Sequence, residues 1–359
     1  MQGRWMGPWE RKGTRGGVLA IVLSIALVAC DPGGEVLVIY TPHGRDLVTH
    51  FGEQFEEAHP GVRVQWLDMG SQEVLERVRS ERANPQGDVW WGAPDDMFIR
   101  AAADGLLEPA RPGWAEHLPE GTFDPGDRWF ATYLTPQVIA YNSDAVAADE
   151  APRRWDDVLD PRWRDQLLIR EPLASGTMRS IFASIIDRES GGTGDPEAGY
   201  EWLLRLDAQT REYVLNPTLL YQKLARQEGQ ITLWNMPDIE TLRATTDFPI
   251  DYVIPEDGTP IVVDGIAVIA GTRQPELARA FLEFAGSEEA LVEAAQRFYR
   301  IPARTDLDPD RLPEWLAEAR PRLQPMEVDA DRVRERTPEW MRHWDTQIRR
   351  RGQASENRQ

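Results

Sequence analysis

The chain has 359 residues, which predicts two or three domains at roughly 100–200 residues each. Its formal net charge of −20 at pH 7 argues against binding to a nucleic-acid backbone, because such binding depends on clustered Lys and Arg. The sequence contains one cysteine, Cys30, so it cannot form an internal disulfide framework or a zinc site built from cysteines.

The N-terminal segment is typical of an export signal. Basic residues lie between 4 and 15, an uncharged apolar run covers 18–29, and Cys30 follows. The run is too short to span a bilayer, which takes about 20 residues, and the arrangement predicts a secretory signal. The four residues that end in Cys30, Leu-Val-Ala-Cys, also resemble the lipobox of bacterial lipoproteins. That resemblance implies a signal peptide over 1–29 and a lipid on Cys30; the alternative is an ordinary signal in which the cysteine is incidental.

After this segment, strands and helices alternate. Apolar runs at 36–40 and 88–91 and an alternating run at 62–66 predict three strands. Apolar residues at helical spacing predict helices after each of these strands, at 47–55, 71–78 and 94–105. The order strand-helix, repeated three times, predicts a parallel, doubly wound sheet and the α/β class.

The remainder of the chain continues this pattern. Further strands are predicted at 129–141, 167–170, 231–234, 252–254 and 261–270, the last two around a turn. Further helices are predicted at 175–186, 197–206, 218–228, 275–285 and 288–298. Residues 309–351 are rich in Pro and charge and are expected to form two or three peripheral helices, followed by a polar tail at 352–359.

Several sequence blocks, taken in their order and spacing, resemble the extracellular solute-binding proteins of bacterial ABC importers. They include Asp-Val-Trp-Trp-Gly at 88–92, Ser-Gly-Thr at 175–177 and Val-Asp-Gly-Ile-Ala-Val at 263–268. The branch that they resemble most contains the ferric-ion-binding proteins and their relatives for phosphorylated sugars and phosphonates.

The resemblance implies a type II two-lobe periplasmic-binding-protein fold, with two crossover strands and a ligand cleft between the lobes. Lobe one is expected at 35–133 plus 262–308, and lobe two at 134–261. It also implies a lipid-anchored, exported monomer in the periplasm or at the outer face of the cytoplasmic membrane, with an ABC permease as partner and no cofactor. The chain has no G-x-S-x-G, H-E-x-x-H or Walker A motif. An exported enzyme on the same scaffold is therefore the weaker alternative.

Two predicted helix starts are candidate anion sites. A helix N-terminus carries unpaired N–H groups and a partial positive charge. Ser175, Gly176 and Thr177 open one helix, and Gly70 and Ser71 open another. The alternative for each serine is a simple helix cap. In the ferric-binding proteins that the chain resembles, the first of these turns contacts an anion bound beside the metal, which favours the ligand reading there.

Three further residues are candidates by their position in the resembling proteins. Asn216 and Asn235 match the same anion site, where amide groups donate without adding charge; the alternative is that they are turn residues. His43 follows the first strand, where ferric-binding proteins place a metal ligand, and with Asp238 it makes a possible metal pair. The alternative for His43 is a surface-turn residue.

The chain also departs from the ferric-binding pattern. Pro237 and Asp238 stand where those proteins carry paired tyrosines, and Ala93 stands where they carry a glutamate. The loss of these anionic ligands disfavours ferric iron as the sole ligand. We therefore expect a small organic anion that bears phosphate or phosphonate. Ferric iron with a synergistic anion and a polyamine are the alternatives. Asp95 and Asp96 could hold an ammonium group or could simply begin a solvated helix.

Overall fold

The computed structural model describes residues 34–349. The predicted signal peptide at 1–29, the lipidated Cys30 and the tail at 352–359 lie outside the described residues. Within 34–349, no helix combines the length and the apolar character needed to cross a membrane.

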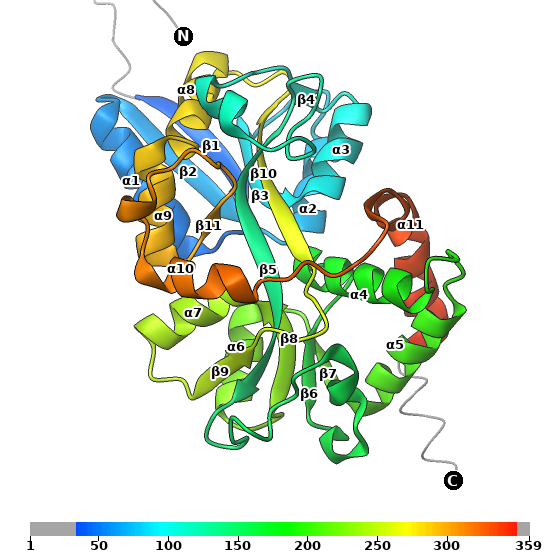
Figure 1. Ribbon diagram of the computed structural model, residues 1–359. Coiled ribbons are helices and arrows are strands. Elements are labelled where there is room, and N and C mark those ends of the chain that lie inside the picture. The colour runs from blue at the N-terminus through cyan, green and yellow to red at the C-terminus, as the bar shows by residue number, and fades with distance from the viewer. Residues whose placement is uncertain (1–33, 350–359) are drawn as a thin grey trace, which may run out of the picture. The chain divides into compact units, whose positions relative to one another are not determined.

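The first sheet begins with three parallel strands, as predicted. β1 (Glu35–Thr41) lies between β2 (Val62–Asp68) and β3 (Val89–Pro94). The helices that follow these strands are α1 (Arg45–Ala58), α2 (Ser71–Ser80) and α3 (Asp95–Ala103). β10 (Ile261–Ile269) then pairs antiparallel with β3 and with the short β4 (Leu107–Glu108). α8 (Pro275–Ala285) and α9 (Glu288–Phe298) complete this lobe, and Figure 1 shows them on the same side of the sheet as α1.

The second sheet is joined to the first by one long strand, β5 (Phe130–Asn142). Its first half pairs with β10, and its second half pairs with β8 (Ile231–Asn235) and β9 (Ile250–Val253). β6 (Leu167–Arg170) lies between β8 and the edge strand β7 (Thr210–Val214). The helices of this lobe are α4 (Gly176–Glu189), α5 (Glu197–Gln209), α6 (Pro217–Ala225) and α7 (Met236–Thr245).

β5 is thus the first crossover between the lobes, and the segment between β9 and β10 is the second. The strands predicted at 252–254 and 261–270 do not pair with each other around a turn. β9 pairs with β5 in the second sheet, whereas β10 pairs with β3 and β5 in the first. The two lobes and two crossovers of the predicted fold are therefore present, and the residue limits proposed for each lobe stay a prediction.

The C-terminal region differs from the expectation of peripheral helices. After β11 (Ile301–Pro302) the chain forms α10 (Glu314–Ala319), α11 (Ala330–His343) and a π-helical turn at Trp344–Ile348. Trp340, Met341, Trp344 and Ile348 are all buried in the core of the second lobe, in one cluster with side chains of α4 and α5. Figure 1 shows α11 beside these two helices. These residues lie on one face of the helical segment, and that face packs inward because it is the apolar one.

Candidate functional site

A cleft of about 810 Å³ is lined by residues of both lobes. Every residue predicted to bind ligand or metal lies in its lining: His43, Gly70, Ser71, Ser175, Gly176, Thr177, Asn216, Asn235 and Asp238. The cleft lies where strands lead into helices, which is the usual position of ligands in α/β sheets. The structure brings the candidates together; direct contact of each with a ligand stays a prediction.

The two glycines among the candidates serve a contact between the lobes. A side chain on Gly70 would run into the carbonyl oxygen of Ala174. A Cβ on Gly176 would lie 2.8 Å from both the Pro94 ring and the Ser71 hydroxyl. The starts of α2 and α4 therefore touch each other at the cleft. The structure requires glycine at both positions for the close approach of one lobe to the other.

Two polar candidates cap their own helices. The Ser175 hydroxyl accepts a hydrogen bond from the Met178 amide at 3.3 Å, and it keeps its own O–H to donate. The Asn216 Oδ1 accepts a hydrogen bond from the Leu219 amide at 3.1 Å, and its side-chain nitrogen takes no part in this cap. Ser175 is therefore a helix cap, as its alternative held, and Asn216 is also a helix cap, for which the alternative was a turn residue. Each retains a donor that a ligand can use.

Asn235 is hydrogen-bonded to Asp238 through both ends of its side-chain amide. Its Oδ1 accepts from the Asp238 amide at 2.9 Å, and its Nδ2 donates to the Asp238 carboxylate at 2.8 Å. Trp234 Nε1 and Arg300 Nη2 also donate to this carboxylate, at 3.1 and 3.2 Å. Asn235 therefore positions Asp238, and its Nδ2 keeps a second N–H beyond the one given to that carboxylate.

The same contacts weaken the metal reading of Asp238 and His43. The Asp238 carboxylate already accepts from three nitrogen donors, so it has little capacity left for a metal ion. Among residues 34–349, no group of three or more His, Cys, Asp or Glu side chains is placed to hold a metal. The donor set therefore does not fit a hard trivalent cation.

His43 is buried on the floor of the cleft. Its ring makes edge contacts with Trp91 and Tyr133, at centroid distances of 5.4 and 5.6 Å. Burial, together with the charge of Arg300, holds the pKa of this imidazole well below its usual value. The ring is therefore neutral at pH 7. Because the side chain is buried, the surface-turn alternative is wrong. Its Nε2 has no hydrogen-bond partner among the described residues.

Arg300 is a cleft residue that the sequence did not reveal. It follows Tyr299, whose left-handed backbone (φ 55°) ends α9, and only 5% of its surface is exposed. Arginines are frequent in this chain, and no motif distinguishes this one. A second buried arginine of the lining, Arg170, donates to the Val214 carbonyl oxygen at 3.4 Å.

The cleft contains charges of both signs. Asp264 is buried there and accepts a hydrogen bond from the Thr135 hydroxyl. Burial raises the pKa of Asp264 to about 6, against the lowering effects of that hydrogen bond and of Arg300. The charged side chains of the lining are Arg45, Arg170, Arg300, Asp46, Asp68, Glu73, Asp238 and Asp264. Side-chain charge alone therefore does not make the cleft an anion site.

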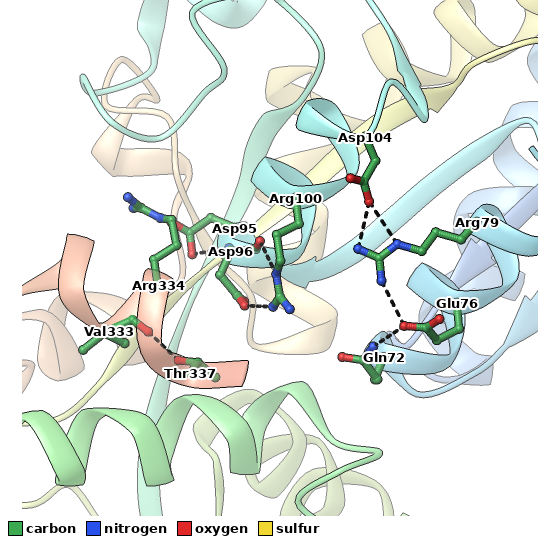
Figure 2. A network of polar contacts seen from close by, with 10 residues as sticks. All are labelled: Gln72, Glu76, Arg79, Asp95, Asp96, Arg100, Asp104, Val333, Arg334 and Thr337. Carbon is green, nitrogen blue, oxygen red and sulfur yellow. Dashed lines mark hydrogen bonds and ion pairs between the residues drawn. The ribbon is translucent and has the colours of Figure 1, made fainter. Parts of the chain in front are cut away.

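The acidic pair at the start of α3 has arginine partners (Figure 2). Asp96 pairs with Arg100 one turn further along the same helix, and Asp95 lies 3.5 Å from Arg334 of α11. Arg334 also pairs with Asp331 at 2.7 Å. Because both carboxylates are paired with arginines, the contacts favour the interpretation that Asp95 and Asp96 begin a helix over the interpretation that they bind an ammonium group. The Asp95–Arg334 pair joins α3 of the first lobe to α11, which packs on the second.

Comparison with known proteins gives three informative relatives. The probable ABC transporter periplasmic-binding protein of Sinorhizobium fredii is 28% identical over 312 residues, which cover 85% of this chain and 81% of that protein. Iron uptake protein A1 of a Synechocystis strain is 27% identical over 258 residues, 68% of this chain and 69% of that protein.

Among solved structures, the periplasmic binding protein AfuA from Actinobacillus pleuropneumoniae, with fructose-6-phosphate bound, superposes with a TM-score of 0.74. The match covers 88% of this chain and 98% of that one at 22% sequence identity, so it supports the fold alone. The family profile of bacterial extracellular solute-binding proteins matches residues 93–324. With the two-lobe fold and the cleft between its sheets, this match establishes that the chain belongs to the bacterial extracellular solute-binding protein family.

Proposed function

We propose that this protein is the solute-binding component of an ABC importer and that it captures a small organic anion bearing phosphate or phosphonate. One observation carries the proposal: the N-terminal ends of six helices open on one cleft. The N-cap residues of α1, α2, α3, α4, α6 and α7 all line it, namely Gly44, Gly70, Pro94, Ser175, Asn216 and Asn235.

These helix ends can bind an anion although the lining also carries acidic side chains. Each helix N-terminus presents N–H groups without intrahelical partners and carries about half a positive charge. Each of the six helices has nine or more residues, so each has a developed dipole. Phosphate and phosphonate offer three acceptor oxygens, which suits a site built from several converging N–H groups.

The relatives support both a phosphorylated solute and iron, and the cleft favours the former. The structural neighbour AfuA was solved with fructose-6-phosphate, whereas one sequence relative is named for iron uptake. Here Asp238 is engaged by Arg300, Trp234 and Asn235, and the tyrosines and glutamate of the ferric pattern are absent from positions 237, 238 and 93. Iron bound together with a synergistic anion is therefore the weaker, second candidate, and a polyamine is the third.

The transport role of the family supports the remaining parts of the proposal. The solute is expected to stabilise the arrangement in which α2 and α4 touch, and the closed protein then docks on a permease of the cytoplasmic membrane. The protein works as an exported monomer held to the membrane by a lipid on Cys30, and it returns its ligand chemically unchanged. Recovery of intact solute from the complex tests the last point, because an enzyme would release a product instead.

A thermal-shift screen tests the proposal. The purified protein, starting at Asp31, is melted with fructose 6-phosphate, 2-aminoethylphosphonate and inorganic phosphate, and separately with fructose, ferric citrate and spermidine. A ligand at about 100 times its Kd stabilises the protein by about 2.7 kcal/mol, which raises the midpoint by several degrees. A shift with a phosphorus compound but not with fructose supports the proposal. A shift with ferric citrate or spermidine alone refutes it.

A further inference from the structure

Arg300 and Asp238 form an ion pair that crosses the cleft. Arg300 lies between α9 and β11, and β11 pairs with Leu134 and Tyr133 of β5 in the first lobe. Asp238 lies in the first turn of α7 in the second lobe. Nη2 of Arg300 donates to Oδ1 of Asp238 at 3.2 Å. The pair therefore connects the lobes at the floor of the site.

The guanidinium has more donors than this pair uses. Its Nε is buried and has no hydrogen-bond partner among residues 34–349. Two other buried side chains of the lining have the same property: Nε2 of His43 and Oε1 of Gln137. All three residues are at least nine-tenths buried. Buried polar groups almost always have partners, so three unpartnered ones in one cleft require an explanation.

A ligand with an anionic group and hydroxyls explains all three. Nε and one Nη of arginine present parallel N–H bonds that match two oxygens of a phosphate. Gln137 offers an acceptor, because its Nε2 already donates to the Thr135 carbonyl oxygen at 2.7 Å. Hydroxyls of the ligand can donate to this oxygen and pair with the neutral imidazole of His43. An ammonium group cannot pair with Nε of Arg300, because it has no acceptor.

We propose that Arg300 is the residue that determines the specificity of the cleft for an anionic solute, and that Asp238 competes with the solute for its guanidinium. This inference rests on the proposed function. It adds the full positive charge of the Arg300 guanidinium to the partial charges of the helix N-termini. It also assigns opposite effects to the two members of one ion pair. Removal of Arg300 removes a ligand contact, whereas removal of the Asp238 charge frees the guanidinium for the ligand.

Two substitutions with calorimetric titration of fructose 6-phosphate test this assignment. We expect Arg300→Gln to weaken binding by about 10- to 100-fold, the effect of lost hydrogen bonds to a charged group. We expect Asp238→Asn to leave affinity unchanged or to increase it. If the pair served only to hold the lobes together, both substitutions would weaken binding. That outcome, or full affinity in Arg300→Gln, would overturn the proposal.

Controls separate this inference from the proposed function. Arg63→Gln makes the same change of charge at an exposed arginine of β2 that lies outside the cleft lining, and we expect its affinity to stay within about twofold of wild type. If Arg300→Gln fails to fold, Arg300→Lys decides the matter. A lysine keeps the positive charge but lacks the two parallel N–H donors of the guanidinium, so the proposal requires that Arg300→Lys binds the solute more weakly. Wild-type affinity in this variant would overturn the proposal. If the wild-type protein binds none of the phosphorus compounds, the proposed function fails; if it binds but Arg300→Gln binds equally well, only this inference fails.

Discussion

The contact between Gly176 and the first lobe gives a direct test of lobe closure. In Gly176→Ala, the added Cβ would lie 2.8 Å from Cδ of Pro94, whereas ordinary contacts begin at 3.4 Å. The difference, 3.4 − 2.8 = 0.6 Å, is the distance by which the lobes must separate at this point. The Ser71 hydroxyl, at the same distance, can rotate away, but the Pro94 ring cannot.

The methyl group should affect closure rather than folding. Overpacking of this kind costs about 1–3 kcal/mol, and that cost falls on the arrangement in which the lobes touch. Within α4 itself alanine is a better helix former than glycine, so the second lobe is not destabilised. We therefore expect solute affinity to fall by about 5- to 140-fold, while the melting midpoint of the ligand-free protein stays level or rises.

Calorimetric titration with the solute identified by the thermal-shift screen measures the affinity. Gly113→Ala is the matched control, because its Cβ would meet no atom closer than 3.6 Å and it lies in the first lobe away from the cleft lining. A second variant that combines Gly176→Ala with Pro94→Ala removes the ring and should recover most of the affinity. Wild-type affinity in Gly176→Ala alone would refute the argument that this contact forms on binding.

Three further predictions concern the anion site, pH and the last helix. Ser175→Ala combined with Thr177→Val should weaken solute binding by about 1–3 kcal/mol in calorimetry, the scale of hydrogen bonds to a charged group, and unchanged affinity would remove that turn from the site. The pKa of Asp264 is raised by burial from 3.8 to about 6, so its ionisation destabilises the fold at pH 7 and that penalty disappears as the pH falls from about 6 to about 4. In urea unfolding, the free energy of unfolding of Asp264→Asn minus that of wild type should therefore be larger at pH 7 than at pH 4.5, by at most about 3 kcal/mol. The same value at both pH values would contradict this. Trp344→Ala should reduce the free energy of unfolding by about 3–5 kcal/mol, because the side chain is fully buried; Leu204→Ala, at a residue with 38% exposure, should change it much less, and similar losses would argue against a core role for Trp344.

The sequence predicted the elements whose apolar residues follow a simple period. β1 to β3 and the helices between them have such patterns, and the structure confirms them. β7 was missed because it is an edge strand of Thr-Arg-Glu-Tyr-Val, in which only Thr210 and Val214 are buried. α7 was missed because it buries only its first turn, at Met236, Pro237 and Ile239, and so has no helical period.

The candidate site was predictable where a local motif defines it. The helix starts at Ser175 and Asn216 could be found because N-cap residues have a recognisable chemistry. The Arg300–Asp238 pair could not, because its members come from different lobes and meet only through tertiary packing. The same reason applies to the contact between Gly70 and Ala174, which lie 104 positions apart in the sequence and in different lobes.

The burial of Trp340 and Trp344 has a consequence for how the chain folds as it is made. The strands of the second sheet are complete by β9, yet the core on one face of that sheet lacks these side chains until α11 has been synthesised. The first sheet is also interrupted, since β10 is added only after the whole second sheet. Neither lobe can therefore finish folding before the other has begun, and both depend on contacts between distant residues. Such a chain should fold slowly, and part of the apolar core of its second lobe should stay exposed until its last helix is available.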